Sequence, residues 1–359
     1  MMKKLLSLVL TLGLTAGLAA CGSTETPAAA DSNTSTETEA ETETETPEAA
    51  ETEPQEEAAS QTEAGEAWTG GYACHSANDF FDAIEYGLNE AAASSNGSII
   101  RADSELATSS EIAIIENFIS QKVDVIFLTP DDPSGSIEGV RLANEAGIPV
   151  VVISSELAED DYEILCTIKS DDYTAASGAA EYAMEAIGKE GDVLILNGMQ
   201  TSDVIDRING YKDTIEKYEN VSIANEVMVS ENSVAACTTA IENMLQACPG
   251  AKAILCFNGF GIPAGYAAMQ NLGIDTNSIS VVDVDGLQAE ADLLASGEMK
   301  LSCAYGQNTP EFGRRAVEEY LAYSKAPESY QMGELLELET IKITTENAAD
   351  YDIYSQMKK

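Results

Sequence analysis

Short apolar runs alternate with amphipathic segments along the chain from Tyr72 onward. Runs of about four to eight apolar residues predict buried strands, whereas apolar residues spaced three and four apart predict helices with one buried face. In 108–121, for example, Ile112, Ile115 and Ile119 share one helical face. Thr108-Ser109-Ser110 precedes that face and can cap the start of the helix.

The predicted strands and helices follow each other in regular alternation. The strands are expected at 97–102, 124–128, 149–153, 192–196, 221–229, 252–257, 279–284 and 300–305. The helices are expected at 79–95, 108–121, 134–146, 171–188, 202–217, 233–247, 261–272, 287–296 and 308–324. Almost wholly apolar strands joined by helices indicate parallel sheets with helices on both faces, so the fold class is α/β. Residues 68–359 are long enough for two such sheets in two domains.

The first residues have the pattern of an export signal. Lys3 and Lys4 precede an apolar run over 5–18, and Leu18-Ala19-Ala20-Cys21 follows. This order of basic, apolar and small residues is typical of a secretory signal peptide, here 1–20. A membrane-spanning helix is the alternative, but it needs about 20 apolar residues, and polar residues and glycines interrupt this run. Leu-Ala-Ala-Cys resembles the bacterial lipobox, which implies a lipid thioether on Cys21, a mature chain that begins there, and anchorage to the outer face of the cell membrane.

Residues 22–67 have the composition of a tether. Thr, Glu, Ala, Pro and Ser dominate, with 14 carboxylates, no Lys or Arg, and scarcely a large apolar side chain before Trp68. Such a segment cannot bury enough surface to offset its ordering entropy, so 21–67 is expected to be a lipidated cysteine followed by a disordered acidic linker. Its span is roughly 40 Å by the flexible-linker estimate. A solubilising tail without a spacing role is the alternative.

Acidic residues also dominate the rest of the chain. The sequence contains 62 Asp and Glu against 18 Lys and Arg, for a formal charge of −44. About −32 of this charge belongs to 68–359 and indicates a solvated acidic surface. Nucleic acid is excluded as a partner, because binding through phosphates needs clustered Lys and Arg.

The cysteines do not form a metal-binding pattern. The chain has no Cys-x-x-Cys, and His75 is its one histidine. A zinc site needs about four nitrogen or sulfur ligands at close spacing, so no metal site is predicted. Buried thiols are the expected state, although export leaves some pairing possible. Apart from Cys21, the cysteines are Cys74, Cys166, Cys237, Cys248, Cys256 and Cys303.

Polar side chains gather in the loops that follow the predicted strands. Ligands of parallel sheets bind at the carboxyl ends of the strands. Amides, hydroxyls and carboxylates with two phenylalanine rings and one arginine suit a neutral polar ligand, whereas a phosphate or dicarboxylate site needs more than one cation. The loops are His75–Phe81, Thr129–Asp132, Ser154–Glu156, Asn197–Arg207, Asn258-Gly259, Asp285-Gly286 and Tyr305–Asn308.

Seven short motifs follow one another over most of 70–350. They are Asn78-Asp79-Phe80-Phe81, Ala143-Asn144-Glu145-Ala146-Gly147-Ile148-Pro149-Val150, Ser170-Asp171-Asp172, Asp206-Arg207-Ile208-Asn209-Gly210-Tyr211, Phe257-Asn258-Gly259, Val282-Asp283-Val284-Asp285-Gly286 and Gly306-Gln307-Asn308. Each is weak alone. In this order they resemble the type I periplasmic binding proteins of the ribose and galactose group, which deliver ligands to ABC importers.

The resemblance implies two Rossmann-like lobes joined by a three-crossover hinge, with the ligand enclosed between them. The first lobe would comprise 68–170 and 308–332, and the second lobe 171–307 and 333–359. The chain would then be an extracytoplasmic binding lipoprotein that captures a sugar or polyol and delivers it to an ABC permease. It would be a monomer without a cofactor, and not an enzyme.

The resemblance also assigns ligand contacts. The first-lobe positions that match are Asn78, Phe80 and Phe81, of which the two Phe would pack against the sugar ring. The second-lobe positions that would bond hydroxyls are Arg207, Asn258, Asp285 and Gln307.

Three places depart from the ribose-binding pattern. Thr129 replaces an Asn, Ser154-Ser155 replaces an Asp-Arg pair that grips several hydroxyls, and Asn232 replaces an aromatic residue. The first lobe thus lacks a charged clamp, so another pentose, hexose, polyol or small polar compound is open. Glu156 or Asp131 could supply the missing acceptor.

Structural roles are the alternative for the same residues. Arg207 could merely neutralise Asp203 and Asp206, and Asn258 and Asp285 could cap the helices that follow them. At least one of the two Phe residues and the lone histidine would then belong to the structure rather than to the ligand site.

Other functions also remain open. Gly259–Ala264 fits Gly-x-Gly-x-x-Ala after a strand, and Asp283 follows at the spacing of a ribose-binding acid, as in an NAD-dependent oxidoreductase. Against this, the motif lies late in the chain, Pro263 disrupts the turn, and export offers little nicotinamide cofactor. A sensor that reports to a membrane receptor, or a binding protein for a nucleoside or an autoinducer-like furanose, would share the same pocket.

Overall fold

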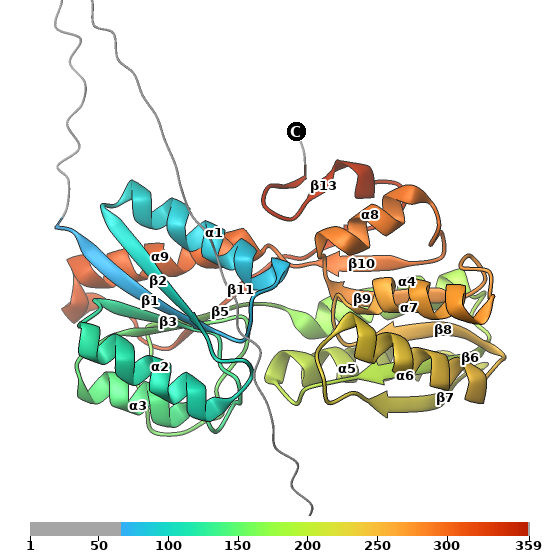
Figure 1. Cartoon of the computed structure of the whole chain (residues 1–359), viewed down its shortest axis with the longest axis horizontal. Helices are drawn as coiled ribbons and strands as arrows, with labels where there is room; N and C mark the ends of the chain where they lie inside the picture. Colours follow the sequence, from blue (N-terminus) through green and yellow to red (C-terminus); the bar gives the residue numbers. More distant parts are fainter. Residues whose placement is uncertain (1–65, 358–359) are drawn as a thin grey trace, which may run out of the picture. The chain divides into compact units, whose positions relative to one another are not determined.

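Two β-sheets organise residues 66–357, the part of the chain that the computed structural model describes (Figure 1). The first sheet has the order β11-β5-β4-β3-β1-β2, and all of its neighbouring strands are parallel. Helices α1 (Asp79–Ser94) and α9 (Thr309–Lys325) cover one face, and α2 (Thr108–Gln121) and α3 (Ile137–Glu145) cover the other. We call this sheet with its helices the first lobe. Its strands are β1 (Trp68–Cys74), β2 (Gly97–Asp103), β3 (Val125–Leu128), β4 (Val150–Ile153), β5 (Cys166–Ser170) and β11 (Glu334–Leu338).

The second sheet has the order β12-β10-β9-β8-β6-β7, and only its edge strand β12 is antiparallel to its neighbour. With its helices it forms the second lobe. Its strands are β6 (Gly191–Asn197), β7 (Val221–Met228), β8 (Ala251–Cys256), β9 (Ser280–Asp285), β10 (Cys303–Gly306) and β12 (Ile341–Ile343). Its helices are α4 (Asp172–Ala186), α5 (Ser202–Ile215), α6 (Val234–Ala247), α7 (Gly261–Leu272) and α8 (Gln288–Ser296). The hairpin of β13 (Tyr351–Asp352) and β14 (Gln356–Met357) follows a 3-10 turn, η2 (Ala348–Asp350), and contacts α8.

Most of the apolar runs form buried strands, as predicted, but β2 and β7 are edge strands of half-buried and exposed residues. Every residue of β3 and β4 is buried, because helices cover both faces of the sheet. The nine predicted helices are confirmed within the described residues, with boundaries that differ by a few residues. The prediction of an α/β fold with parallel sheets is therefore confirmed.

Some predictions of local structure fail. Strand β5 was not predicted, because Lys169 interrupts its apolar run, and the edge strands β11 and β12 carry too many charged residues to form such runs. The expected cap of α2 is also wrong. The helix begins at Thr108 itself, so its hydroxyls lie inside the first turn, and Ala107 at the N-cap offers no side-chain acceptor.

The chain passes between the two sheets at three places. It leaves the first sheet after Ser170, returns after Gly306 into α9, and leaves again between β11 and β12. We expected the third passage after residue 332. Because β11 pairs with β5, it falls after Leu338 instead.

The six cysteines of the described residues are unpaired thiols, and five of them are buried. Within 66–357 no group of His, Cys, Asp and Glu side chains is placed to hold a metal ion. The helices of this part of the chain are also too short or too polar to cross a bilayer.

Two carboxyl groups lie in the core of the second lobe. Asp283 on β9 and Glu290 on α8 are fully buried. Asp283 Oδ2 accepts a hydrogen bond from Ile262 N at 2.8 Å, and Glu290 accepts one from Leu287 N, so the pair fixes the starts of α7 and α8. Burial raises the pKa of both groups, and the charge of Asp283 raises the pKa of Glu290 further. The pair therefore retains a proton in the folded state where free carboxyls have lost theirs.

Helices α1 and α9 meet at glycines, and this contact generates a stability prediction. A Cβ at Gly313 would overlap backbone atoms of Ile84 and Leu88. Gly313→Ala should therefore push the helices apart and lower the free energy of unfolding by about 1–3 kcal/mol, measured by urea denaturation. Gly250→Ala is the control, because an added Cβ there meets open space. Equal stability of the two variants would contradict the close approach of α1 and α9.

The buried carboxyl pair predicts how stability varies with pH. Since the folded-state pKa of Glu290 is raised, its contribution is complete at low pH and is lost as pH rises through the raised value. Glu290→Gln, which needs no proton, should reduce the fall in melting temperature between pH 5 and pH 8. The exposed Glu216 provides the control, because Glu216→Gln should retain the wild-type fall. Superimposable pH profiles for all three proteins would contradict the retained proton.

Candidate functional site

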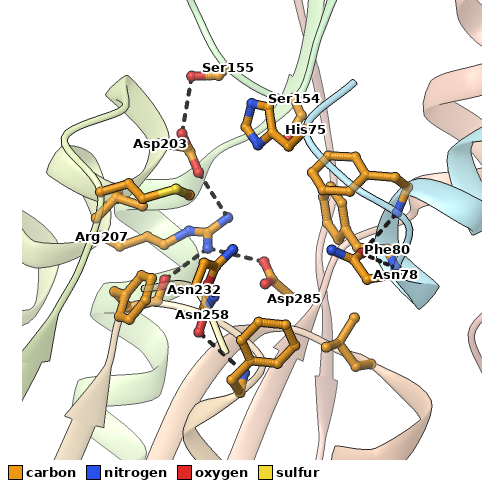
Figure 2. A pocket seen from close by; sticks show the side chains of 16 residues that line it. His75, Asn78, Phe80, Ser154, Ser155, Asp203, Arg207, Asn232, Asn258 and Asp285 are labelled. Atoms are coloured by element: carbon orange, nitrogen blue, oxygen red, sulfur yellow. Dashed lines mark hydrogen bonds and ion pairs between the residues drawn. The ribbon is translucent and has the colours of Figure 1, made fainter. Parts of the chain in front are cut away.

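A pocket lies where the loops at the carboxyl ends of both sheets meet (Figure 2). Its enclosed volume is about 50 Å³. The first lobe contributes His75, Asn78, Phe80, Phe81, Ser154 and Ser155. The second lobe contributes Met199, Asp203, Val204, Arg207, Asn232, Phe257, Asn258, Phe260, Asp285 and Leu287. This is the place that the strand-end argument predicted for a ligand.

The guanidinium of Arg207 lies at the centre of the charged groups. It contacts Asp172 Oδ1 through Nε at 2.8 Å, Asp285 Oδ1 through Nη1 at 3.0 Å and Asp203 Oδ2 through Nη2 at 3.6 Å. Figure 2 shows it pointing between Asp203 and Asp285. Of the two partners expected for a purely neutralising arginine, only Asp203 is in contact, because Asp206 instead accepts from Lys169 at 3.2 Å.

The protonation of this cluster follows from its burial. Burial alone would lower the pKa of Arg207, but Asp285, Asp172 and Asp203 raise it above its ordinary value, so the guanidinium stays charged. Burial raises the pKa of Asp172 to about 7, against the opposing charge of Arg207. Burial also raises the pKa of Asp285, again opposed by Arg207. The cluster thus places one permanent cation beside carboxyl groups that accept hydrogen bonds.

Asp285 ends β9 in an unusual backbone conformation. Its φ is 147°, a value that side chains other than glycine rarely adopt, and the next residue, Gly286, has a φ of 75°. Gly286 is needed there because a Cβ would overlap Gly306. Asp285 Oδ2 accepts from Gly259 N at 3.0 Å, and Oδ1 accepts from Gln307 Nε2 at 2.9 Å. Backbone strain of this kind persists only where surrounding contacts stabilise the conformation, and it is concentrated at functional sites.

Two amides of the second lobe are joined beside Arg207. Asn258 Nδ2 donates to Asn232 Oδ1 at 2.7 Å, and Asn258 Oδ1 accepts from Phe260 N at 3.2 Å. Neither Asn258 nor Asp285 is a helix cap, because the N-caps of α7 and α8 are Phe260 and Leu287. The capping alternative is therefore wrong for both residues.

Aromatic rings form the first-lobe wall. Phe80 and Phe81 are 7% and 6% exposed, so both belong to the core and both line the pocket. Asn78 caps α1, and its Oδ1 accepts from the backbone N–H groups of both Phe residues. The ring of His75 packs edge-on against Phe81 at 5.0 Å, and its Nε2 lies 2.9 Å from Pro130 O.

Two serines connect this wall to the second lobe. Ser154 has a φ of 75° and lines the pocket. Ser155 Oγ lies 3.0 Å from Ser202 Oγ and donates to Asp203 Oδ1 at 3.0 Å. The hydroxyl of Ser155 thus bonds directly between the lobes.

Two of the predicted ligand residues do not line the pocket. Thr129 is buried, and its hydroxyl has no hydrogen-bond partner among the described residues. Gln307 is also fully buried and donates to Asp285, so it supports that carboxylate from behind. Neither proposed substitute acceptor lines the pocket, because Glu156 binds Lys169 and Asp131 accepts from Ser104.

Several pocket residues were not predicted as ligand contacts. Asp203 was considered only as a partner of Arg207, although residues four apart on a helix share a face, and this was a usable signal. For His75 the expected role is structural, yet the residue also lines the pocket. The remaining pocket residues are apolar and look like core residues in the sequence: Met199, Val204, Phe257, Phe260 and Leu287.

The residues of the possible dinucleotide motif, Gly259–Ala264 and Asp283, have roles in the packing of the second lobe. Asp283, its candidate ribose-binding acid, is fully buried and accepts from Ile262 N. A Cβ at Gly261 would overlap Cys256, so that glycine serves the packing of α7 on β8. Asp283 is thus not accessible to a ribose hydroxyl.

Comparisons with known proteins agree with this geometry. The family model described as periplasmic binding protein domain matches residues 73–328. The ribose import binding protein of Bacillus subtilis (strain 168) is 27% identical over 243 residues, 67% of this chain and 76% of that protein.

Solved structures share the fold. An ABC transporter solute-binding protein from Agrobacterium vitis, bound with α-D-tagatopyranose, has a TM-score of 0.73 at 21% identity and covers 81% of this chain and 99% of its own. One from Bacillus halodurans, with bound myo-inositol, has a TM-score of 0.71 at 20% identity, with 80% and 98% covered. Two lobes with the same architecture, and a family match over most of the described residues, show that this chain belongs to the periplasmic binding protein domain family.

Proposed function

We propose that the chain is an extracytoplasmic binding protein that encloses a sugar or polyol between its lobes and delivers it to an ABC permease. The observation that carries this proposal is the charged set of Asp203 and Arg207 on α5 and Asp285 at the end of β9, which lines one pocket together with the aromatic wall. The names and bound ligands of the relatives support the same class. The proposal involves binding without chemical conversion of the ligand.

The pocket residues suit hydroxyl groups. Asp203 and Asp285 keep acceptor sites for ligand hydroxyls beside their bonds within the protein, and the guanidinium of Arg207 donates to hydroxyl oxygens. The planar side-chain amide of Asn258 both donates and accepts hydrogen bonds. Phe80 and Phe81 cover the C–H surface of the ligand, which the polar groups leave unbound.

Ligand entry requires the lobes to separate. The enclosed volume of about 50 Å³ holds only a few water molecules. A sugar therefore enters when the lobes open about the three passages between the sheets, and it is covered when they close. Closure would then present both lobes to the permease together.

Membrane attachment and oligomeric state are part of the proposal. Cys21, the signal peptide 1–20 and residues 22–65 of the acidic tether lie outside the described residues. We propose that a lipid on Cys21 anchors a monomer to the outer face of the membrane and that the tether gives it reach. The ligand class includes furanose forms of sugars and nucleosides as less favoured members.

Removal of one pocket charge should weaken binding. Asp285→Asn keeps the shape of the side chain but removes the charge that strengthens its hydrogen bonds to hydroxyls. We expect calorimetry against pentoses, hexoses, polyols and nucleosides to show binding of at least one sugar or polyol, and this variant to weaken it by roughly tenfold to a hundredfold.

The exposed carboxylate of Asp350 on η2 provides the matched control, since Asp350→Asn should leave the affinity unchanged. An Asp285→Asn protein that melts like the wild type and binds as tightly would place the ligand elsewhere. A wild-type protein that binds no sugar or polyol would overturn the proposed function.

Loss of the lipidation site should release the protein. In cells, Cys21→Ala removes the only thiol at the predicted cleavage position, so we expect the chain to move from the membrane fraction to the soluble exported fraction. Fractionation followed by immunoblotting measures this change. Cys248→Ala, which alters a partly exposed thiol in the folded part, should remain in the membrane fraction. Retention of Cys21→Ala in the membranes would contradict the anchor.

A further inference from the structure

Charge is distributed unequally between the two walls of the pocket. Every Asp and Arg side chain that lines it, among the described residues, comes from the second lobe: Asp203, Arg207 and Asp285. Hydrogen bonds to ionised groups are roughly twice as strong as those between neutral groups. The second lobe therefore offers the strong partners for ligand hydroxyls.

The polar atoms of the first lobe are largely engaged within the protein. Asn78 Oδ1 accepts two backbone N–H groups, and its Nδ2 donates to Ser76 Oγ at 3.4 Å. Ser155 Oγ donates its proton to Asp203 and accepts one hydrogen bond from Ser202, which leaves it one lone pair. An oxygen that already accepts two hydrogen bonds has no lone pair left for a ligand hydroxyl. At these two positions the first lobe thus retains one amide N–H of Asn78 and one lone pair of Ser155, both on neutral groups.

The rest of the first-lobe wall is mainly aromatic. Phe80 and Phe81 pack edge to face with ring centroids 5.2 Å apart, and His75 extends the row at 5.0 Å from Phe81. The Nε2 atom of His75 lies 2.9 Å from Pro130 O and 3.7 Å from Asp131 Oδ1, so this nitrogen is directed to the protein. The hydroxyl of Ser154 and the second nitrogen of His75 remain for the ligand on this side, beside the amide N–H of Asn78 and the lone pair of Ser155.

From this asymmetry we propose that the ligand is a deoxy sugar, with its hydroxyls toward the second lobe and its deoxygenated carbon, such as a methyl group, against Phe80 and Phe81. This inference rests on the proposed function and names the ligand within it. A hydroxyl placed against the two rings would lose its bonds to water without a replacement, whereas a methyl group there gains apolar contact.

The test compares sugars that differ by one oxygen. The full-length protein, purified in detergent, is titrated calorimetrically with D-galactose and D-fucose, D-glucose and 6-deoxy-D-glucose, L-mannose and L-rhamnose, and D-ribose and 5-deoxy-D-ribose. We expect the deoxy member of at least one pair to bind about tenfold to a hundredfold more tightly than its parent. In no pair should the parent sugar bind more tightly than its deoxy partner.

Each other result overturns the inference. Parent sugars that bind as tightly as their deoxy partners, or a polyol that binds while all four pairs do not, leave the proposed function standing but remove the deoxy preference. Absence of binding by any sugar or polyol overturns both. The two failures are therefore distinguishable.

A substitution in the first-lobe wall gives an independent measurement. Ser154→Asp places a carboxylate on the wall, and Asp tolerates the positive φ at this position better than most residues. It should reduce the affinity ratio between deoxy and parent sugar by at least about fivefold. Ser324→Asp on the exposed face of α9 is the control and should keep the wild-type ratio. A folded Ser154→Asp protein with an unchanged ratio would show that the deoxygenated carbon does not face this wall.

Discussion

The burial of one guanidinium is the constraint on which the arrangement of the second lobe and its pocket depends. Arg207 is 2% exposed, and a cation so far from water is tolerated only when partners compensate for its lost hydration. Those partners come from three separate segments: Asp172 at the first passage between the sheets, Asp203 on the same helix, and Asp285 at the end of β9. The ion pairs that neutralise Arg207 therefore fix the start of α4, helix α5 and the end of β9 relative to one another.

This geometry also explains why backbone strain is retained at the pocket. Asp285 adopts a φ of 147° and Ser154 a φ of 75°, conformations that cost free energy in any isolated peptide. At Asp285 the bonds from Gly259, Gln307 and Arg207 hold the carboxylate from three sides. The ligand thus meets acceptors that are already oriented, and little ordering entropy has to be lost when it binds.

The sequence predicts most of this fold, because buried parallel strands and amphipathic helices leave strong periodic signals. The prediction of strands fails at β5, where Lys169 breaks the apolar run. It also fails at the edge strands β11 and β12, because their charged residues interrupt the apolar pattern. At the site, strand-end position identified Arg207, Asn258 and Asp285 correctly as pocket residues. The same argument predicts Thr129 and Gln307 in the pocket, which they do not line. A place at the end of a strand specifies the edge of a sheet but not the direction of a side chain. Phe257 and Leu287 leave no signal that separates a pocket wall from a core.

The serine pair at 154–155 changes how the lobes are held together. In the ribose-binding pattern that this chain resembles, an Asp-Arg pair at this place grips several hydroxyls of the ligand. Here Ser155 bonds directly to Ser202 and Asp203, and buried Lys169 joins Glu156 of the first lobe to Asp206 of the second. Part of the contact between the lobes is therefore made by the protein's own side chains. A ligand shifts an equilibrium only by its differential affinity for the two states, so here it needs to supply less of the free energy of closure. The pocket can then close on a ligand that presents few hydroxyls to the first lobe.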